Sequence, residues 1–240
     1  MNQSIDQPGQ VRSGEEIALD SLNKYLLSSD PFTSPVAEVG QFPGGYSNLT
    51  YLLKTRDGKE YVLRRPPFGA EPIKGGHDVA REYRVLTVIQ QAGYSKIPQP
   101  ILLCDDQGVI GCPFYVMERV PGVILRAQTA AKLSLTANQL RATSKALVDN
   151  LVDLHALDLE ATGLNQLGKP EGYIERQVEG WHRRYLVAQT DELPVVEQLY
   201  RWLTENRPVG NQATLIHNDY KYDNLVLNPD DMSQILAVLD

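Results

Sequence analysis

Long apolar runs and cysteine are both scarce in this sequence. No stretch approaches the roughly 18 apolar residues that a membrane-spanning helix needs. The two cysteines, Cys104 and Cys112, fit neither a disulfide framework nor a zinc-binding pattern. Residues 1–10 are polar and lack the basic start and apolar core of a signal peptide. These absences predict a soluble, cytoplasmic protein that has no membrane partner.

Clustered positive charge is also missing. The 240 residues include 23 Lys and Arg against 30 Asp and Glu, a net charge of -7, and no basic run. Nucleic acids bind proteins chiefly through phosphate contacts to clustered Lys and Arg, so a nucleic-acid partner is disfavoured. The overall charge does not exclude a local basic pocket. With 42 % hydrophobic residues, the chain is long enough to form one large domain or two small lobes.

The first half of the chain has the pattern of an antiparallel sheet. Residues 1–12 are predicted to be a loose tail, and Ser13 with Glu16 fits a capping box that predicts a helix over about 14–28. Short apolar segments separated by Gly and Pro then predict strands, with one helix among them. The strands are expected at 36–42, 48–55, 60–65, 101–104 and 114–118, and the helix at 77–91.

The second half is predicted to be mainly helical. The expected helices are 136–157 and 173–189, and the expected short strands are 214–216, 225–227 and 235–239. A strand-rich part before a helix-rich part indicates an α+β fold with two lobes and a hinge near Met117–Gly122. The expected divisions are an N-terminal tail and helix (1–35), an N-lobe (36–120) and a partial C-lobe (121–240).

The most informative segment carries His217, Asp219 and Asn224 in the spacing H-x-D-x-x-x-x-N, between two apolar stretches. Phosphoryl transfer needs a carboxylate that accepts the proton of the attacking hydroxyl, and oxygen ligands that hold magnesium against the phosphates. Asp219 suits the first role, and Asn224 with Asp240 suits the second. The structural alternative is an Asx-rich surface loop that hydrogen-bonds its own backbone.

The segment from Leu215 to Leu227 resembles the catalytic loop of the aminoglycoside phosphotransferases and the related choline-kinase-like enzymes. The strand that carries Arg64, shortly before the double proline Pro66-Pro67, most resembles the corresponding strand of the kinase-like domains linked to acyl-CoA dehydrogenases. The motifs follow the family's order from about residue 36 to residue 240. The resemblance implies a bilobal, protein-kinase-like fold whose N-lobe binds the nucleotide.

The resemblance also implies roles for N-lobe residues. The phosphate-covering loop would include Gly44, Gly45, Ser47 and Asn48, with a plain hairpin turn as the alternative. Arg64 would bind the α- and β-phosphates and pair with Glu82 on the following helix. An Arg–carboxylate pair can be bidentate, which would fix this geometry. A solvated helix charge is the alternative interpretation of Glu82.

Two more groups of residues receive roles in the same way. Phe114 to Glu118 followed by Pro121-Gly122 resembles the adenine-binding hinge. The backbone around Glu118 and Val120 would then read the base, and Met117 would line the pocket or simply belong to the core. Lys221, two residues after Asp219, would steady the transferring phosphate, or it would be a solvated loop lysine.

The resemblance implies an enzyme that uses ATP and Mg²⁺ to phosphorylate a hydroxyl group of a small molecule, with a hydroxyacyl-CoA favoured over an antibiotic. A nucleotide-binding pseudokinase or an inactive truncated module is the alternative, and a Ser/Thr protein kinase is a third hypothesis. The sequence lacks G-x-x-x-x-G-K-[ST], which argues against a P-loop kinase. Members of the family usually continue beyond the position of Asp240, so we expect a C-terminally truncated chain with an incomplete acceptor-binding part.

Overall fold

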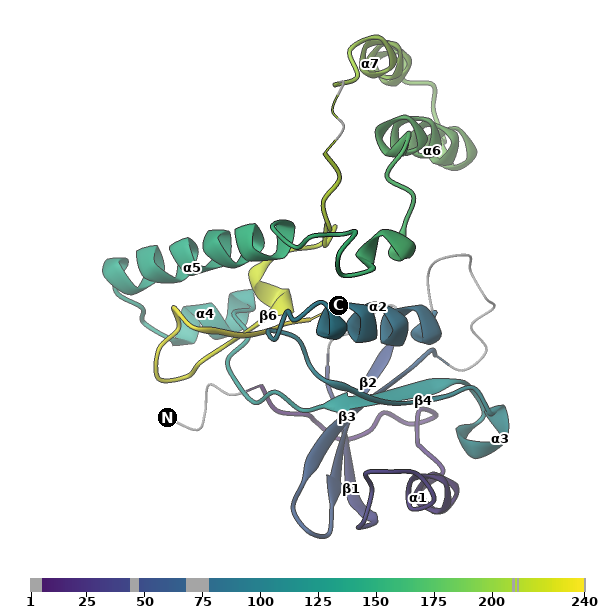
Figure 1. Ribbon diagram of the computed structural model, residues 1–240, viewed down its shortest axis with the longest axis vertical. Coiled ribbons are helices and arrows are strands. Elements are labelled where there is room, and N and C mark those ends of the chain that lie inside the picture. Colours follow the sequence, from purple (N-terminus) through teal and green to yellow (C-terminus); the bar gives the residue numbers. More distant parts are fainter. Residues whose placement is uncertain (1–5, 44–47, 68–77, 209, 211, 240) are drawn as a thin grey trace. The chain divides into compact units, whose positions relative to one another are not determined.

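The computed structural model describes residues 6–43, 48–67, 78–208, 210 and 212–239 (Figure 1). The chain divides into two compact units, one made of Met1–His155 with Ile216–Asp240 and the other of Ala156–Leu215. The expected lobe boundary between residues 120 and 121 falls inside the first unit and stays a prediction.

The first unit is built on a five-stranded antiparallel sheet with the strand order β1-β2-β3-β5-β4. Its strands are β1 (Val36–Gln41), β2 (Leu49–Thr55), β3 (Glu60–Arg65), β4 (Pro100–Cys104) and β5 (Phe114–Glu118). Gly58 has φ +85° in the tight turn between β2 and β3, a backbone conformation that glycine adopts readily. All five strands expected from the sequence are confirmed, with shifts of at most one residue at their ends.

Each face of the sheet has its own core, because successive side chains of a strand point to opposite faces. Leu63 packs into one core with α1 (Leu19–Leu26) and α3 (Gln107–Ile110). The neighbouring Val62 packs into the other core with α2 (Val79–Gln91). Figure 1 shows α2 on one side of the sheet and α1 with α3 on the other. A β3 side chain two positions from Val62 therefore faces α2.

The segment before α1 runs along the edge of the sheet. Gly9 exchanges two backbone hydrogen bonds, of 2.8 and 3.0 Å, with Gln41 at the end of β1. Asp6 donates its N–H to the Gly122 carbonyl at 3.0 Å, and its carboxylate forms a 2.5 Å ion pair with Arg126. The prediction of a loose tail is wrong for residues 6–12, because pairing with a strand edge leaves no hydrophobic pattern in the sequence.

The predicted capping box is also wrong. α1 begins at Leu19, and its N-cap residue, Ala18, makes no side-chain capping bond. The carboxylate of Glu16 accepts from the Gly14 N–H in a local turn, and that of Glu15 accepts from Gln41. Bonds to a turn and to β1 thus replace the helix cap that the sequence indicated.

A small hairpin and two helices complete the first unit. These elements are α4 (Ala127–Lys132), α5 (Ala137–His155), a 3-10 turn (Tyr222–Asn224), β6 (Leu225–Leu227) and β7 (Ile235–Val238). Val123 and Leu227 exchange two backbone hydrogen bonds of 2.9 Å, which join the chain after β5 to β6. A Cβ atom at Gly122 would lie 2.6 Å from the Leu227 carbonyl oxygen, so this approach requires glycine.

The helix expected at 136–157 and the strands expected at 225–227 and 235–239 are confirmed, whereas the expected strand at 214–216 is wrong. Residues 214–216 have no regular structure, although their apolar composition favours a strand.

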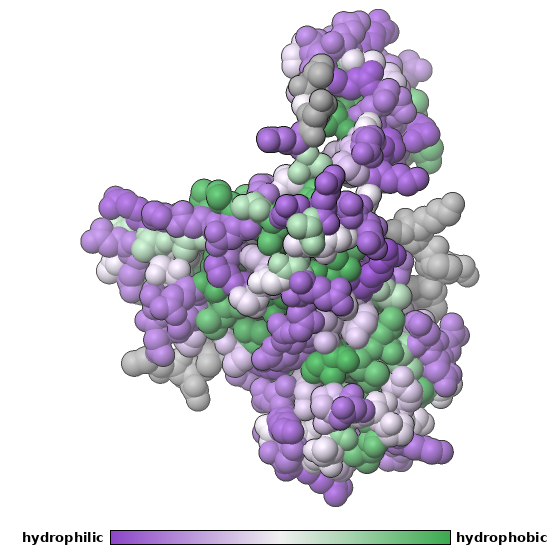
Figure 2. All heavy atoms as spheres, viewed as in Figure 1, coloured by the Kyte–Doolittle hydropathy of each residue, from purple (hydrophilic) through white to green (hydrophobic). Residues whose placement is uncertain are grey.

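The second unit is helical and contains a 3-10 turn (Leu164–Leu167), α6 (Tyr173–Ala188) and α7 (Pro194–Glu205). His182 stacks on Tyr200 at 3.8 Å and lies 2.6 Å from a Glu197 carboxylate oxygen, which joins the two long helices. Several large apolar side chains are exposed here, among them Trp181, Val187, Val195, Leu199 and Trp202, and Figure 2 shows green hydrophobic residues at the surface of this unit. Within the described ranges, no helix is long and apolar enough to cross a membrane.

Candidate active site

Arg64 and Glu82 form an ion pair between β3 and α2. Arg64 Nε lies 3.2 Å from Glu82 Oε2, and Nη2 donates to Oε1 at 3.5 Å. The side chain of Arg64 is 10 % exposed and that of Glu82 is 31 % exposed. Arg64 follows Val62 by two positions, so the pleat directs it toward α2. Arg65 points to the other face, where it donates to the Tyr51 hydroxyl.

Glu82 also binds two uncharged side chains. Asn48 Nδ2 donates to Oε1 at 2.6 Å, and the Tyr115 hydroxyl donates to Oε2 at 3.0 Å. Burial, together with the neighbouring Glu82 carboxylate and against the opposing effect of Arg64, raises the pKa of the Tyr115 hydroxyl. Tyr115 therefore stays protonated and remains a donor. We name these four residues, Asn48, Arg64, Glu82 and Tyr115, the Glu82 cluster.

Asn48 has an unused acceptor in this cluster. The side chain is buried, and its Oδ1 accepts no hydrogen bond from the part of the chain that the structure describes. The other expected members of the phosphate-covering loop, Gly44, Gly45 and Ser47, lie outside the described residues. The role of the loop stays a prediction.

The residues of the expected hinge lie where β5 ends. Met117 is buried in the same core as Tyr115, next to α2, which is compatible with both interpretations of this residue. The Glu118 N–H donates to the Gln99 carbonyl at 2.8 Å, so it is occupied within the protein. Val120 packs against the core of the β6–β7 hairpin. The adenine-reading role of this backbone stays a prediction.

The H-x-D-x-x-x-x-N segment forms a loop that closes on itself. Asn224 Nδ2 donates to the backbone oxygen and to Oδ2 of Asp219, each at 3.0 Å. Asn218 has φ +67°, a left-handed conformation that Asn tolerates better than most residues. These bonds are also those of an Asx-rich loop, so on their own they do not decide between a structural and a catalytic loop.

His217 ties this loop to the end of β7. The Asp219 N–H donates to His217 Nδ1 at 3.4 Å, which leaves Nε2 to donate to the Leu239 carbonyl at 2.9 Å. The Leu239 N–H in turn donates to the Asn224 carbonyl at 2.8 Å. The residue before Asp240 is therefore bonded to both ends of the H-x-D-x-x-x-x-N segment, while Asp240 itself lies outside the described residues.

Asp219 and Lys221 form an exposed ion pair. Lys221 Nζ lies 2.8 Å from Asp219 Oδ2, and the two side chains are 51 % and 61 % exposed. The bond from Lys221, aided by its charge and by the Asn224 amide, lowers the pKa of the Asp219 carboxyl, and Asp219 raises the pKa of Lys221. The carboxylate is therefore ionised at neutral pH, as a general base must be.

The donors near this loop suit magnesium held together with phosphates. The described residues contain no group of three or more His, Cys, Asp or Glu side chains that could hold a metal on its own. Asn224 binds Asp219 through Nδ2, which keeps its Oδ1 outside that bond. Mg²⁺ prefers oxygen ligands and is often held by one or two protein oxygens, substrate phosphates and waters. The chemistry of the donor set thus fits a metal–nucleotide complex.

Sequence reasoning missed Tyr115 as a partner of Glu82, although a signal was present. Tyr115 pairs directly with Arg64 across β3 and β5, and it lies two positions before Met117. The alternation of strand residues would have placed Tyr115, Arg64 and Met117 on one face of the sheet.

Comparison with known proteins decides the family. The phosphotransferase enzyme family matches the chain over residues 38–240. The chain belongs to this family. Of its relatives, the mouse protein named acyl-CoA dehydrogenase family member 10 is 37 % identical to this phosphotransferase chain over 232 residues. The match covers 96 % of this chain and 21 % of the mouse protein, so the chain spans about a fifth of that relative's length.

Solved structures show the fold of this phosphotransferase chain. A candidate aminoglycoside phosphotransferase from Ralstonia eutropha is 30 % identical with a TM-score of 0.78, over 94 % of this chain and 64 % of that one. The GDP complex of aminoglycoside 2'-phosphotransferase-IIIa is 18 % identical with a TM-score of 0.62, over 93 % and 72 %. The expected α+β, protein-kinase-like fold and the resemblance to the kinase-like domains linked to acyl-CoA dehydrogenases are confirmed.

Proposed function

We propose that this chain binds Mg²⁺–ATP and transfers the γ-phosphoryl group to a hydroxyl of a small molecule. The carrying observation is the closed loop in which Asn224 holds Asp219 and keeps an amide oxygen outside that bond. Membership of the phosphotransferase family favours the catalytic interpretation of this loop over a structural Asx loop.

Asp219 would act as the general base. As the acceptor hydroxyl oxygen bonds to the γ-phosphorus, its proton passes to the Asp219 carboxylate. The bond between the γ-phosphorus and the oxygen that bridges to the β-phosphate breaks, and ADP leaves with that electron pair. Lys221, 2.8 Å from the carboxylate, would place a positive charge beside the transferring group.

The Glu82 cluster would orient the nucleotide. Arg64 would bind the α- and β-phosphates, and Glu82 would keep its guanidinium in place. Because Asn48 and Tyr115 also bind Glu82, the carboxylate is fixed before the nucleotide arrives. A structural relative solved as a GDP complex supports a purine nucleotide as the ligand.

The hinge and the metal ligands complete this assignment. The backbone around Glu118 and Val120 would bind the adenine base, with Met117 beside it. Asn224 and Asp240 would hold the magnesium, which supplies neutralisation of phosphate charge when bound. Gly44, Gly45 and Ser47 would cover the phosphates with backbone N–H groups.

The acceptor class proposed first is a hydroxyacyl-CoA. The reason is the name of the mouse relative, acyl-CoA dehydrogenase family member 10, which points to acyl-CoA chemistry. Aminoglycosides come second, because the structural relatives named for them are less similar in sequence, at 30 % and 18 % identity, than the mouse protein at 37 %.

The test is a transfer assay with a panel of acceptors. The chain is incubated with Mg²⁺–ATP and, separately, hydroxyacyl-CoA thioesters, aminoglycosides and choline, and ADP and phosphorylated products are measured by mass spectrometry. We expect one acceptor class to be phosphorylated and the product to vanish with EDTA. Nucleotide binding without product for any acceptor would support a non-catalytic module, and absence of binding would overturn the whole proposal.

A further inference from the structure

Two tyrosines alternate with the charged residues of the catalytic loop. Tyr220 follows Asp219, and Tyr222 follows Lys221. Lys221 has an extended backbone, with φ -152° and ψ 168°, and in extended chain successive side chains point in opposite directions. The Asp219–Lys221 pair faces solvent, whereas the tyrosines are partly buried and point toward α5.

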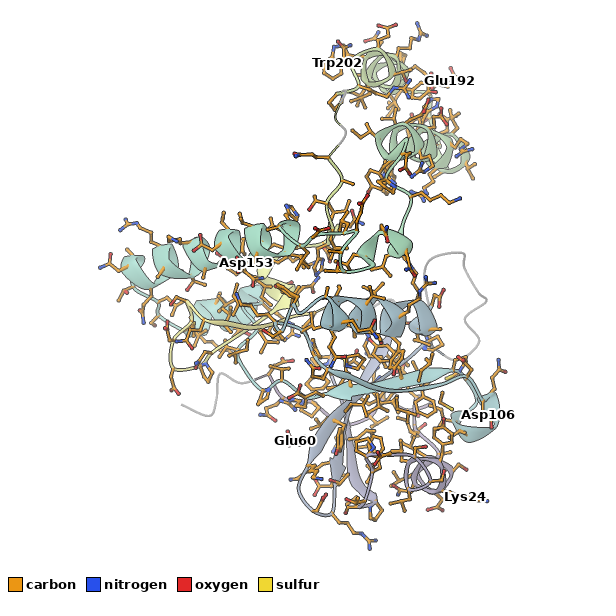
Figure 3. The ribbon with its side chains drawn as sticks, in the orientation of Figure 1. Lys24, Glu60, Asp106, Asp153, Glu192 and Trp202 are labelled. Carbon is orange, nitrogen blue, oxygen red and sulfur yellow. The ribbon has the colours of Figure 1, made fainter. Side chains whose placement is uncertain are left out.

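Both tyrosine hydroxyls bond to one side of α5. Tyr220 donates to the Leu147 carbonyl at 3.0 Å and accepts from Asn150 Nδ2 at 2.9 Å. Tyr222 donates to Ser144 Oγ at 3.0 Å. Ser144, Leu147 and Asn150 are spaced by three, so they share one side of the helix. Figure 3 labels Asp153, one turn further along α5.

The hydrogen bonds of Asn150 fix the orientation of its amide. Asn150 is 1 % exposed, and its Oδ1 accepts from the Tyr94 hydroxyl at 3.0 Å. Because the Tyr220 proton goes to Leu147, Tyr220 has to accept from Nδ2, which leaves Oδ1 for Tyr94. Nδ2 of Asn150 therefore acts as the donor to Tyr220, and Oδ1 acts as the acceptor from Tyr94. A buried amide with defined donors and acceptors specifies one geometry.

We infer that Asn150 and Tyr220 are positioning residues that hold Asp219 in place for catalysis by fixing the catalytic loop to α5. The inference rests on the proposed function, since it assigns these residues to the same reaction. Neither side chain provides the base or the metal ligands. Their effect passes through the backbone, because Tyr220 is the residue next to Asp219 and its hydroxyl is tied to the helix at two points.

The experiment compares Tyr220→Phe with Tyr94→Phe. Each variant deletes one hydroxyl that bonds to Asn150, but only Tyr220 belongs to the catalytic loop. We expect kcat of Tyr220→Phe to fall about tenfold while the KM for ATP stays within about twofold, because misplacing a catalytic group affects the chemical step. We expect Tyr94→Phe to keep kcat within about twofold of wild type, although it should lose about as much thermal stability as Tyr220→Phe does. Equal kcat losses in both variants, or no loss in Tyr220→Phe, would overturn the inference.

Hydrogen exchange of the backbone amides of residues 217–224 tests the inference without any activity. We expect these amides to exchange about tenfold faster in Tyr220→Phe than in wild type, and Tyr94→Phe to match wild type. Unchanged protection in Tyr220→Phe contradicts the positioning role. If wild type transfers no phosphate but the exchange result holds, the proposed function fails and the attachment of the loop to α5 stands.

Discussion

The Glu82 cluster and the loop of residues 217–224 each contain an ion pair, but the two pairs lie in opposite environments. Arg64 is 10 % exposed under α2 and shares Glu82 with two neutral donors. Asp219 is 61 % exposed and pairs with Lys221, which is 51 % exposed. Breaking a buried pair leaves an uncompensated charge, whereas an exposed pair contributes little to stability. The ion pair of the Glu82 cluster is thus coupled to folding, whereas the Asp219–Lys221 pair is accessible to solvent.

The largest expected effect separates activity from stability at the exposed pair. Asp219→Asn removes the base but keeps the shape of the side chain, so we expect transfer to fall by about 10³-fold. The free energy of unfolding should change by less than about 0.5 kcal/mol, because the side chain is exposed. Steady-state kinetics and urea unfolding of the same samples provide the two values. Asp223→Asn, an exposed change in the same loop, is the control; a comparable loss of activity there would remove the special role of Asp219.

At the Glu82 cluster we expect the reverse, a substitution that clearly lowers the free energy of unfolding. Glu82→Gln leaves Arg64 without its anionic partner, so the free energy of unfolding should fall by about 2 kcal/mol, less than for a fully buried pair because Glu82 is 31 % exposed. Urea unfolding measures the change. The control is Glu38→Gln, whose 4.0 Å pair with Lys54 is largely exposed and should be neutral. Equal stability of both variants would contradict the contrast between the two environments.

Gly122 connects the sheet to the β6–β7 hairpin and tests how tightly the two regions are joined. In Gly122→Ala the new Cβ would lie 2.5 Å from Val226 Cγ1 and 2.6 Å from the Leu227 carbonyl oxygen. Relieving these contacts should cost about 1–2 kcal/mol of unfolding free energy. Gly168→Ala, at a position with nothing within 4 Å, is the matched control in thermal unfolding. A neutral Gly122→Ala would mean that the junction is loosely packed.

The smallest effect is a shift along the pH axis. Lys221 keeps the pKa of Asp219 below its ordinary value, so the charged base persists as the pH falls. In Lys221→Met this cause is absent, the pKa of Asp219 rises, and the acid limb of the pH profile of kcat/KM should move to higher pH. Lys221→Arg keeps the charge and should leave the limb near that of wild type. An acid limb that stays in place in Lys221→Met would assign it to another group.

The sequence predicted the strands better than the segments that join them. Alternation and turn residues were enough to locate all five strands, because those signals are local. The attachment of residues 6–12 to β1 and to the segment after β5 was missed, since it depends on backbone bonds to Gln41 and Gly122 that carry no residue pattern. The capping box at Ser13 was predicted wrongly because the carboxylates of Glu15 and Glu16 bind elsewhere.

The site shows the same division between local and distant information. The motif residues Asp219 and Asn224 could be named from their spacing, and Arg64 and Glu82 from the family resemblance; the structure brings each of these pairs together. Asn150 could not be found, because nothing in its neighbourhood on α5 indicates that Tyr220, 70 positions away, is its partner. Long-range side-chain hydrogen bonds leave no periodic signal in a single sequence.

Calorimetric titration of the chain with Mg²⁺–ATP tests the central claim most directly. The claim is that the Glu82 cluster forms the phosphate-binding side of a nucleotide site. We predict one binding site whose affinity falls at least about tenfold in Arg64→Met, because a charge-assisted contact to phosphate is lost, and stays unchanged in Arg56→Met on the turn after β2. Equal affinities of wild type and Arg64→Met would contradict the account.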